Sequence, residues 1–309
     1  MNFLYQLYFW IPQFRSLGLF GKAIHKVNAL ILKRIFDLIL PGYYLRTMDK
    51  AGIGLIEEKR TIPIIVSVTS FPARINHVWI SLEILFRQTV KPDMIILWLA
   101  ETQFPNKKVP DSLIKLQSRG LTIRFCEDLR SHKKYYFAMT EFPNACIMTF
   151  DDDLYYDKNV IKRVVEVYER HPDCICTNRA HEIKIKNGNV QPYNKWNHNA
   201  KNILFPSNAL LQTGGAGTLY PPKSLSESTF DKNLIQTLCL HADDVWLKLM
   251  ATLNDKKVIT HSFYNKDFLT VKSSQLEKLV TKNVFDGGND KQFQDVCNHF
   301  SITPSQFID

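Results

Sequence analysis

Cysteine, glycine and proline are all sparse in this chain of 309 residues, and their placement excludes several classes of protein. The six cysteines form no zinc-binding pattern, because Cys174 and Cys176 are one residue closer than a C-x-x-C pair and no second pair follows. The 12 glycines and 14 prolines are too scattered for a collagen-like or low-complexity chain. With 45% hydrophobic and 22% charged residues, the composition is that of a globular protein with a buried core.

The sequence also lacks long apolar runs and the features of a secretory leader. The first residues, Met1 to Tyr5, contain neither a basic region nor a small-residue cleavage site, so no cleaved signal peptide is expected. Residues 202–222 carry no charge, but their glycines, prolines and polar side chains make them a poor membrane span. We therefore expect a chain that does not cross the bilayer and works in the cytoplasm, where its cysteines stay reduced.

Acidic residues are fewer than basic ones, and the basic excess is concentrated near the N-terminus. The formal net charge is +9, and the first 60 residues hold nine Lys or Arg against four Asp or Glu. Residues 1–58 read as a basic, amphipathic helical extension, with an aromatic stretch at 3–14 and a helix that Pro41 should end. Its predicted apolar stripe is Ile24, Val27, Ile31, Ile35 and Leu38, and its polar side is Lys22, Lys26, Lys33 and Asp37. Such a helix suits peripheral contact with an anionic membrane, which we favour; packing on the catalytic domain or on a second subunit is the alternative.

From residue 59 onward, strand and helix patterns alternate. Strands are predicted at 62–68, 94–99, 121–125, 145–150 and 173–177, and helices at 76–88, 111–118 and 159–170. The first strand is β-branched and almost continuously apolar, as in a parallel sheet covered on both faces. We therefore predict that residues 59–309 form one α/β domain. Its mostly parallel sheet should be flanked by helices, with a ligand site at the carboxyl ends of the strands.

Three consecutive aspartates, Asp151, Asp152 and Asp153, follow the fourth predicted strand. Their mutual repulsion would be costly without a cation, and Mg²⁺ takes one or two protein carboxylates together with phosphate oxygens and water. Asp151 and Asp153 are spaced i, i+2, so their side chains point the same way in an extended chain. We favour a site for Mn²⁺ or Mg²⁺; a cluster that stabilises the start of the next helix is the alternative.

Four segments in order along the chain give a resemblance to a known family. They are 66–74 (VSVTSFPAR), 151–153 (DDD), 214–220 (GGAGTLY) and 242–246 (ADDVW). Over roughly residues 61–265, the chain resembles the GT-A fold glycosyltransferases, especially the family 2-like bacterial enzymes that build surface polysaccharides. The resemblance implies a Rossmann-like GT-A fold and a nucleotide-sugar donor, which we expect to be a UDP-sugar.

The resemblance also implies roles for individual residues at the donor. The base and ribose would contact Thr69, Ser70, Phe71 and Arg74, although the chain departs here from the commoner Pro-Thr-Tyr-Asn form. Donor contacts would also come from Asp151 and Asp152, and the metal would be bound by Asp153, Asp151 and, as a further candidate, His261. The positive charges of Lys133 and Lys134 would stabilise the diphosphate; a solvated basic loop is the alternative for this pair. Gly215 and Gly217 would let the backbone come close to the donor sugar or the acceptor; a flexible bend is the alternative for this segment.

Asp243 and Asp244 open a helix predicted at 242–252. The positive end of the helix dipole favours ionised carboxylates at this position. In inverting enzymes of the family that the chain resembles, the second acid of such a pair is the base. Asp244 is therefore the predicted catalytic base and Asp243 its partner, with helix capping as the alternative for both.

These features predict a metal-dependent glycosyltransferase, hexosyltransferase-like and inverting, at the inner face of the cell membrane. Its acceptor would be a glycan or a lipid-linked glycan, with no nucleic-acid partner. A sugar nucleotidyltransferase is one alternative, but its Gly-rich, Arg- and Lys-bearing segment after the first strand is absent. A non-enzymatic protein that binds membrane or nucleic acid is the other; it would explain the charge but not the clustered aspartates.

Overall fold

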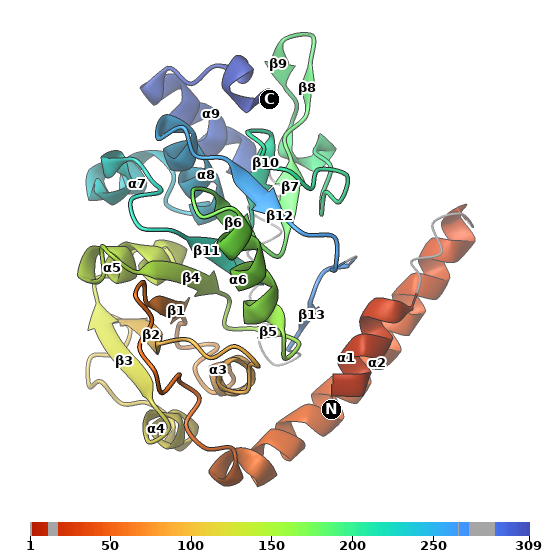
Figure 1. Ribbon diagram of the computed structural model, residues 1–309, viewed down its shortest axis with the longest axis vertical. Coiled ribbons are helices and arrows are strands. Elements are labelled where there is room, and N and C mark those ends of the chain that lie inside the picture. The colour runs from red at the N-terminus through yellow and green to blue at the C-terminus, as the bar shows by residue number, and fades with distance from the viewer. Residues whose placement is uncertain (1, 12–17, 265, 272–287) are drawn as a thin grey trace.

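The computed structural model describes residues 2–11, 18–264, 266–271 and 288–309, and a seven-stranded sheet lies at its centre (Figure 1). The order of the strands is β12-β6-β11-β4-β1-β2-β3, and β11 alone in this sheet runs antiparallel to its neighbours. The strands are β1 (Ile64–Thr69), β2 (Met94–Ala100), β3 (Leu121–Cys126), β4 (Cys146–Phe150), β6 (Ile175–Thr177), β11 (Thr218–Tyr220) and β12 (Val258–Thr260). The predicted α/β class with a mostly parallel sheet is confirmed.

Helices cover both faces of the sheet. Successive residues of a strand point to opposite faces, so Ile64 and Val66 join one apolar core while Ile65 joins another. The first core is covered by α3 (Val78–Phe86), α4 (Asp111–Gln117) and α6 (Val160–Arg170). The opposite face is covered by α5 (Lys133–Glu141), α8 (Asp243–Leu253) and α9 (Gly288–Phe300), with α7 (Lys232–Leu238) packed beside them.

Short strand pairs lie outside the central sheet. They are β5 (Leu154–Tyr155) with β13 (Leu269–Thr270), β7 (Ala180–Glu182) with β10 (Leu210–Gln212), and β8 (Ile185–Lys186) with β9 (Asn189–Val190). Because β5 directly follows the three aspartates, its partner β13 lies beside them, and the Val271 amide donates to the Asp153 carbonyl at 2.7 Å. Residues 266–271, which we name the strap, are thus hydrogen-bonded to the backbone of the predicted metal-binding segment.

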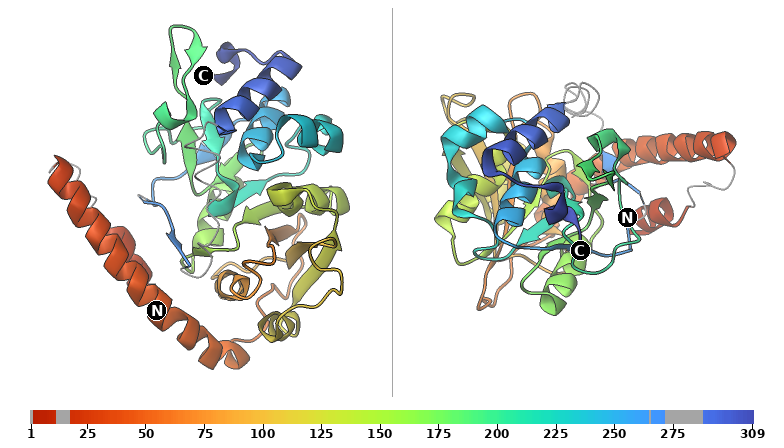
Figure 2. Two further views of the ribbon diagram at one scale, coloured as in Figure 1. Left: turned by 180° about the vertical axis from the view of Figure 1, so that it is seen from behind. Right: turned by 90° about the horizontal axis from the view of Figure 1, so that it is seen from above.

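Two helices precede the domain, α1 (Asn2–Trp10) and α2 (Gly18–Thr47), and Figure 2 shows α2 running along its outside. The predicted helical extension is confirmed, but α2 continues past Pro41, where the sequence predicts its end. Leu40 and Tyr44 are buried on either side of Pro41, and we infer that this packing offsets the roughly 3 kcal/mol that proline costs inside a helix. Residues 12–14 of the predicted aromatic stretch lie outside the described residues. Within the part of the chain described above, no helix is long and apolar enough to span a membrane.

The N-terminal helices contact the strap and the end of β5. The Tyr8 hydroxyl donates to the Asp267 carbonyl at 2.8 Å, and the Lys33 ammonium donates to the Thr270 carbonyl. On α2, Asp37 accepts a hydrogen bond of 3.0 Å from the Tyr155 hydroxyl. Of the predicted polar side, Lys33 and Asp37 therefore face the domain, whereas Lys26 is exposed. The division of the chain at residue 58 stays a prediction.

Candidate active site

The predicted site residues gather where β1 and β4 end. These neighbouring strands are parallel, so the residues that follow each of them lie at the same edge of the sheet. The Ser70 hydroxyl donates to Asp152 Oδ2 at 2.6 Å, and Arg74 Nη1 donates to Asp152 Oδ1 at 2.7 Å. The Thr69 hydroxyl donates to the Trp98 carbonyl of β2 at 2.9 Å. The structure thus brings the loop after β1 to the three aspartates.

Asp152 is buried, and both of its carboxylate oxygens are engaged by Ser70 and Arg74. Burial raises the pKa of Asp152, and the charge of Arg74 opposes that rise. Arg74 also lies 3.1 Å from Asp153 Oδ2 and stacks over the Phe71 ring, 5.3 Å from its centre. Asp152 and Arg74 therefore join the loop to the triplet, and a donor contact by either of them stays a prediction.

Asp151 and Asp153 form the part of the triplet that fits a divalent cation. Burial, and after it the charge of Asp151, raises the pKa of Asp153 to about 7. A divalent cation would relieve this repulsion. No group of three or more His, Cys, Asp or Glu among the described residues could hold a metal by itself. One or two carboxylates are, however, the protein contribution that Mg²⁺ commonly uses, with phosphate oxygens and water as its other ligands. These residues fit an ion shared with a substrate phosphate.

Lys134 joins the triplet to the second group of aspartates. Its Nζ lies 3.0 Å from Asp151 Oδ1 and 3.0 Å from Asp243 Oδ2. Burial alone would lower the pKa of Lys134, but the charges of Asp151 and Asp243 raise it well above its ordinary value, so the ammonium stays charged. Lys133, the other predicted lysine, instead pairs with Asp128 at 2.6 Å. Of the two lysines, only Lys134 contacts both groups of aspartates, through Asp151 and Asp243.

The glycine-rich segment forms a tight turn, η5 (Gly214–Ala216), between the two groups of aspartates. The Gly214 amide donates to Asp244 Oδ1 at 2.8 Å, and the Asp151 amide donates to the Gly215 carbonyl at 3.3 Å. A Cβ on Gly215 would lie 1.8 Å from Asp151 Oδ2, and Gly217 has a φ of +93°. A side chain at 215 would therefore displace the Asp151 carboxylate, and the left-handed backbone at 217 favours glycine.

Asp243 and Asp244 occupy the first turn of α8, whose N-cap is Ala242, and no side chain caps this helix end. Capping therefore does not account for either aspartate. Burial raises the pKa of Asp243, but the charge of Lys134 outweighs it and leaves that pKa below its ordinary value. Burial, and after it the charge of Asp243, raises the pKa of Asp244 to about 7. The expectation that the helix dipole favours the ionised form of both is thus wrong for Asp244, because burial and like charge outweigh the dipole.

His261, a further predicted metal ligand, directly follows β12. Its Nε2 is 2.8 Å from Asn178 Oδ1, and its Nδ1 accepts from the Phe263 amide at 3.2 Å. Both ring nitrogens are therefore engaged by neighbouring groups. These contacts hold the chain after β12 in place, and a role for His261 as a ligand beside Asp151 and Asp153 stays a prediction.

Arg179 adds a positive charge that the four motifs do not include. Its Nε donates to Thr213 Oγ1 at 2.8 Å, and its Nη1 donates to Asp267 Oδ1 of the strap at 2.9 Å. Burial lowers the pKa of Arg179, but the charge of Asp267, followed by those of Asp244 and Asp151, raises it overall. Arg179 therefore lies within electrostatic reach of both groups of aspartates. The signal in the sequence is its place just after a predicted strand, since ligands bind at strand ends.

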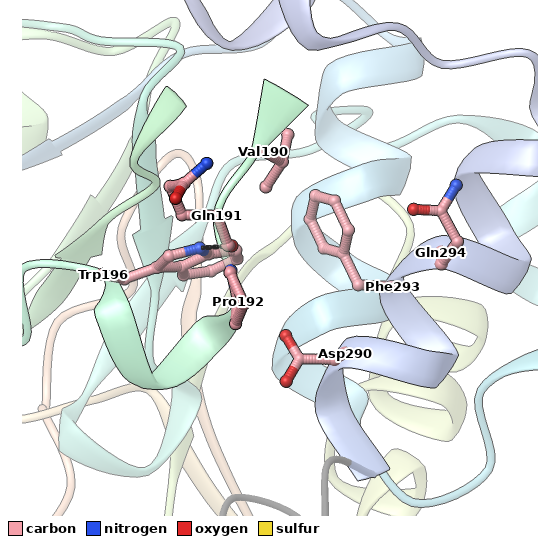
Figure 3. Close-up of a pocket in the computed structure, with 7 residues that line it drawn as sticks. All are labelled: Val190, Gln191, Pro192, Trp196, Asp290, Phe293 and Gln294. Atoms are coloured by element: carbon pink, nitrogen blue, oxygen red, sulfur yellow. Dashed lines mark hydrogen bonds between the residues drawn. The ribbon is translucent and has the colours of Figure 1, made fainter. Parts of the chain in front are cut away.

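A separate cavity of about 260 Å³ lies between the end of β9 and α9 (Figure 3). The Trp196 indole donates to the Gln191 carbonyl at 2.6 Å, and Asp290 accepts from the Tyr193 amide at 2.6 Å. None of the predicted site residues lines this cavity, whose walls are Val190, Gln191, Pro192, Trp196, Asp290, Phe293 and Gln294. It is thus distinct from the group of aspartates described above.

Comparison with known proteins gives a likeness of fold. No family model and no curated protein matches this sequence. Similar solved structures include the mannosyltransferase PcManGT from Pyrobaculum calidifontis in complex with GDP-Man and Mn²⁺, at 13% identity and a TM-score of 0.41, over 91% of this chain and 78% of that one. Another is S. aureus TarS 1-349, at 15% identity and a TM-score of 0.39, over 79% and 73% of the two chains. A third is a 4-diphosphocytidyl-2C-methyl-D-erythritol synthase, at 9% identity and a TM-score of 0.40, over 67% of this chain and 93% of that one. Identities and TM-scores this low carry no argument about function.

Proposed function

We propose that this protein is a metal-dependent glycosyltransferase that moves a sugar from a nucleotide-diphosphate donor, a UDP-sugar, to a glycan or lipid-linked acceptor. The observation that carries the proposal is the position of Lys134, 3.0 Å from both Asp151 and Asp243. One ammonium group thereby links the acids expected to bind donor and metal with the acids expected to supply the base. A donor diphosphate and an acceptor hydroxyl would meet within one compact site.

The donor end of this site combines acidic and basic groups. Asp151 and Asp153 would hold a Mn²⁺ or Mg²⁺ ion, which when bound would neutralise charge on the leaving diphosphate. Lys134 and Arg179 would place two further positive charges near the same oxygens, and both are held by hydrogen bonds before the donor arrives. Such fixed charges stabilise a leaving group without reorganisation during the reaction.

At the acceptor end, Asp244 has the properties of a general base. Its pKa of about 7 lies where a base combines a useful fraction of the ionised form with sufficient proton affinity. The Gly214 amide holds one carboxylate oxygen at 2.8 Å and so fixes its orientation. Asp244 would take the proton of the acceptor hydroxyl as that oxygen attacks the sugar carbon and the bond to the diphosphate breaks. This arrangement fits transfer with inversion.

The setting we propose is the inner face of the cell membrane, with a role in surface polysaccharide synthesis. The net charge of +9 and the basic N-terminal residues support this location, because the inner leaflet carries anionic lipids.

Ligand-dependent thermal unfolding, combined with product analysis, tests the proposed reaction. We expect stabilisation by UDP only when Mn²⁺ is present, and release of UDP from one or more UDP-sugars. Parallel samples with GDP test the identity of the base. Release of pyrophosphate from UTP and a sugar 1-phosphate would instead show a nucleotidyltransferase. Stabilisation by a double-stranded oligonucleotide but not by UDP with Mn²⁺ would overturn the enzymatic proposal.

A further inference from the structure

Helix α2 is apolar on two opposite sides. On the inner side, four residues spaced by four are buried against the domain: Leu32, Phe36, Leu40 and Tyr44. The Phe36 ring packs on Tyr155 of β5, with 5.5 Å between ring centres. A surface helix with this single stripe would carry polar residues on its outer side.

The outer side of α2 is apolar as well. Its exposed apolar side chains are Phe20, Val27, Leu30, Ile31, Leu38 and Leu45, with exposed fractions from 51% for Ile31 to 82% for Leu38. Of the stripe predicted from the sequence, Val27, Ile31 and Leu38 are exposed and the other two residues are half-buried. Val27, Ile31 and Leu38 therefore look away from the domain, whereas Ile35 packs against its core. The helix is held mainly by the second stripe on its inner side.

Helix α1 also carries exposed apolar side chains. Phe3 and Trp10 are 70% and 78% exposed. Helix α2 alone has 30 residues, which corresponds to about 45 Å. We name the exposed apolar side chains of α1 and α2 the outer face. A large exposed apolar surface on a folded protein marks a site of contact with a protein or a membrane.

Basic residues accompany the outer face. The exposed basic residues between 18 and 50 include Lys26, Arg34, Arg46 and Lys50, whereas Asp49 is the single exposed acid among the side chains described there. This excess of positive charge complements anionic lipid headgroups. Long basic side chains can also reach the headgroups while their stems cover apolar surface.

We propose that the outer face lies in the interface of an anionic lipid bilayer, with α2 parallel to the membrane plane. Arg34 favours a bilayer over a second copy of the chain, because it follows Ile31 by three residues and precedes Leu38 by four, on the same stripe. A helix dimer along this stripe would bury the guanidinium group and Pro41. In a bilayer interface the arginine extends to the lipid phosphates.

The inner contacts would fix the orientation of the docked domain. Tyr8 and Lys33 are hydrogen-bonded to the strap, and Asp37 to β5. The outer face is therefore rigidly attached to the segment that lies beside the aspartates. Docking rests on the membrane setting of the proposed function but not on the proposed reaction, so membrane binding and catalysis can fail separately.

Vesicle binding of the full chain tests this proposal without any measurement of turnover. The probes are vesicles of phosphatidylcholine alone and vesicles with added phosphatidylglycerol, at low and high salt. The test variant is Ile31→Gln with Leu38→Gln, and the matched control is Ile114→Gln, a residue of α4 that is 52% exposed. Because these side chains are exposed, all variants should keep the thermal stability of the parent protein.

We expect binding to phosphatidylglycerol vesicles that weakens with salt and falls roughly tenfold or more in the double variant, as two apolar side chains leave the interface. The control should bind like the parent. Arg34→Gln should reduce the preference for anionic vesicles. Absence of binding to anionic vesicles at low salt, or equal loss in the control, would overturn the proposal. So would a lipid-free dimer, seen by sedimentation, that the double variant converts to monomer while the parent ignores vesicles.

Discussion

Replacing Asp244 with asparagine separates the charge of this residue from its shape. Asparagine can still accept the hydrogen bond of 2.8 Å from the Gly214 amide, but it cannot take a proton from an acceptor. We expect Asp244→Asn to keep its affinity for UDP with Mn²⁺ and to lose roughly a hundredfold or more in kcat, the range expected for a general base.

The same substitution has a calculable effect on stability. The pKa of Asp244 rises from 3.8 to about 7 in the folded protein, so its contribution to stability is full below pH 3.8 and is lost as the pH rises toward 7. That difference corresponds to about 4 kcal/mol as an upper limit, and partial exposure to water reduces it to roughly 2–4 kcal/mol. The free energy of unfolding of Asp244→Asn should therefore increase relative to that of the parent protein as the pH rises from 4 to 8.

Denaturant unfolding of the ligand-free protein at pH 4 and pH 8, with turnover at saturating donor and Mn²⁺, measures both effects. Asp243→Asn is the matched variant. It removes the charge that helps raise the pKa of Asp244, so the acidic limb of its kcat profile should move to lower pH. It should also lose stability near neutral pH, because Asp243 pairs with Lys134. If Asp244→Asn turns over normally, or if its unfolding keeps the pH dependence of the parent, the reasoning is refuted.

Three further substitutions test the donor end of the site. Asp153→Asn should stabilise the ligand-free protein at pH 8, because burial and the charge of Asp151 make the ionised Asp153 carboxylate costly. It should also abolish the Mn²⁺-dependent stabilisation by UDP in thermal unfolding. Retained stabilisation would contradict the metal assignment. Arg74→Met leaves the buried Asp152 without its cation and should lower the free energy of unfolding, measured with denaturant, by about 3–5 kcal/mol. Loss of a surface ion pair costs about 1 kcal/mol or less, so a decrease of that size would show that the pair is dispensable. Gly215→Ala would place a methyl group against Asp151 and should weaken UDP binding by calorimetry at unchanged secondary structure; parent affinity would argue against this close approach.

Periodicity predicted the sheet, and the family resemblance implied that the loop after β1 and the aspartates share one donor site. The first strand illustrates why, since its apolar β-branched residues leave few alternatives to a buried parallel strand. The end of α2 was predicted wrongly at Pro41, because the inner packing of Leu40 and Tyr44 is a tertiary effect that local propensity does not contain.

Contacts between distant segments could not be derived from the sequence. Arg179 and Asp267 are 88 residues apart, and their ion pair depends on how the strap crosses the site. The raised pKa of Asp244 depends on burial and on Asp243 together, whereas the sequence shows only the helix start that favours ionisation. The contact of His261 with Asn178 is hidden for the same reason: the order of elements places the histidine after a strand but does not show where its ring points.

The strap offers a route from the N-terminal helices to the site, and Tyr8→Phe tests it. The Tyr8 hydroxyl donates to the Asp267 carbonyl at 2.8 Å, and the Asp267 carboxylate holds Arg179 at 2.9 Å. Loss of one such hydrogen bond costs about 1 kcal/mol, enough to loosen the strap without unfolding the domain. We expect a rise of a few-fold in the KM for donor, with kcat and vesicle binding unchanged. The control is Tyr43→Phe, at an exposed tyrosine of α2. The same KM in both variants would mean that the helices hold the domain at the membrane without influencing its chemistry.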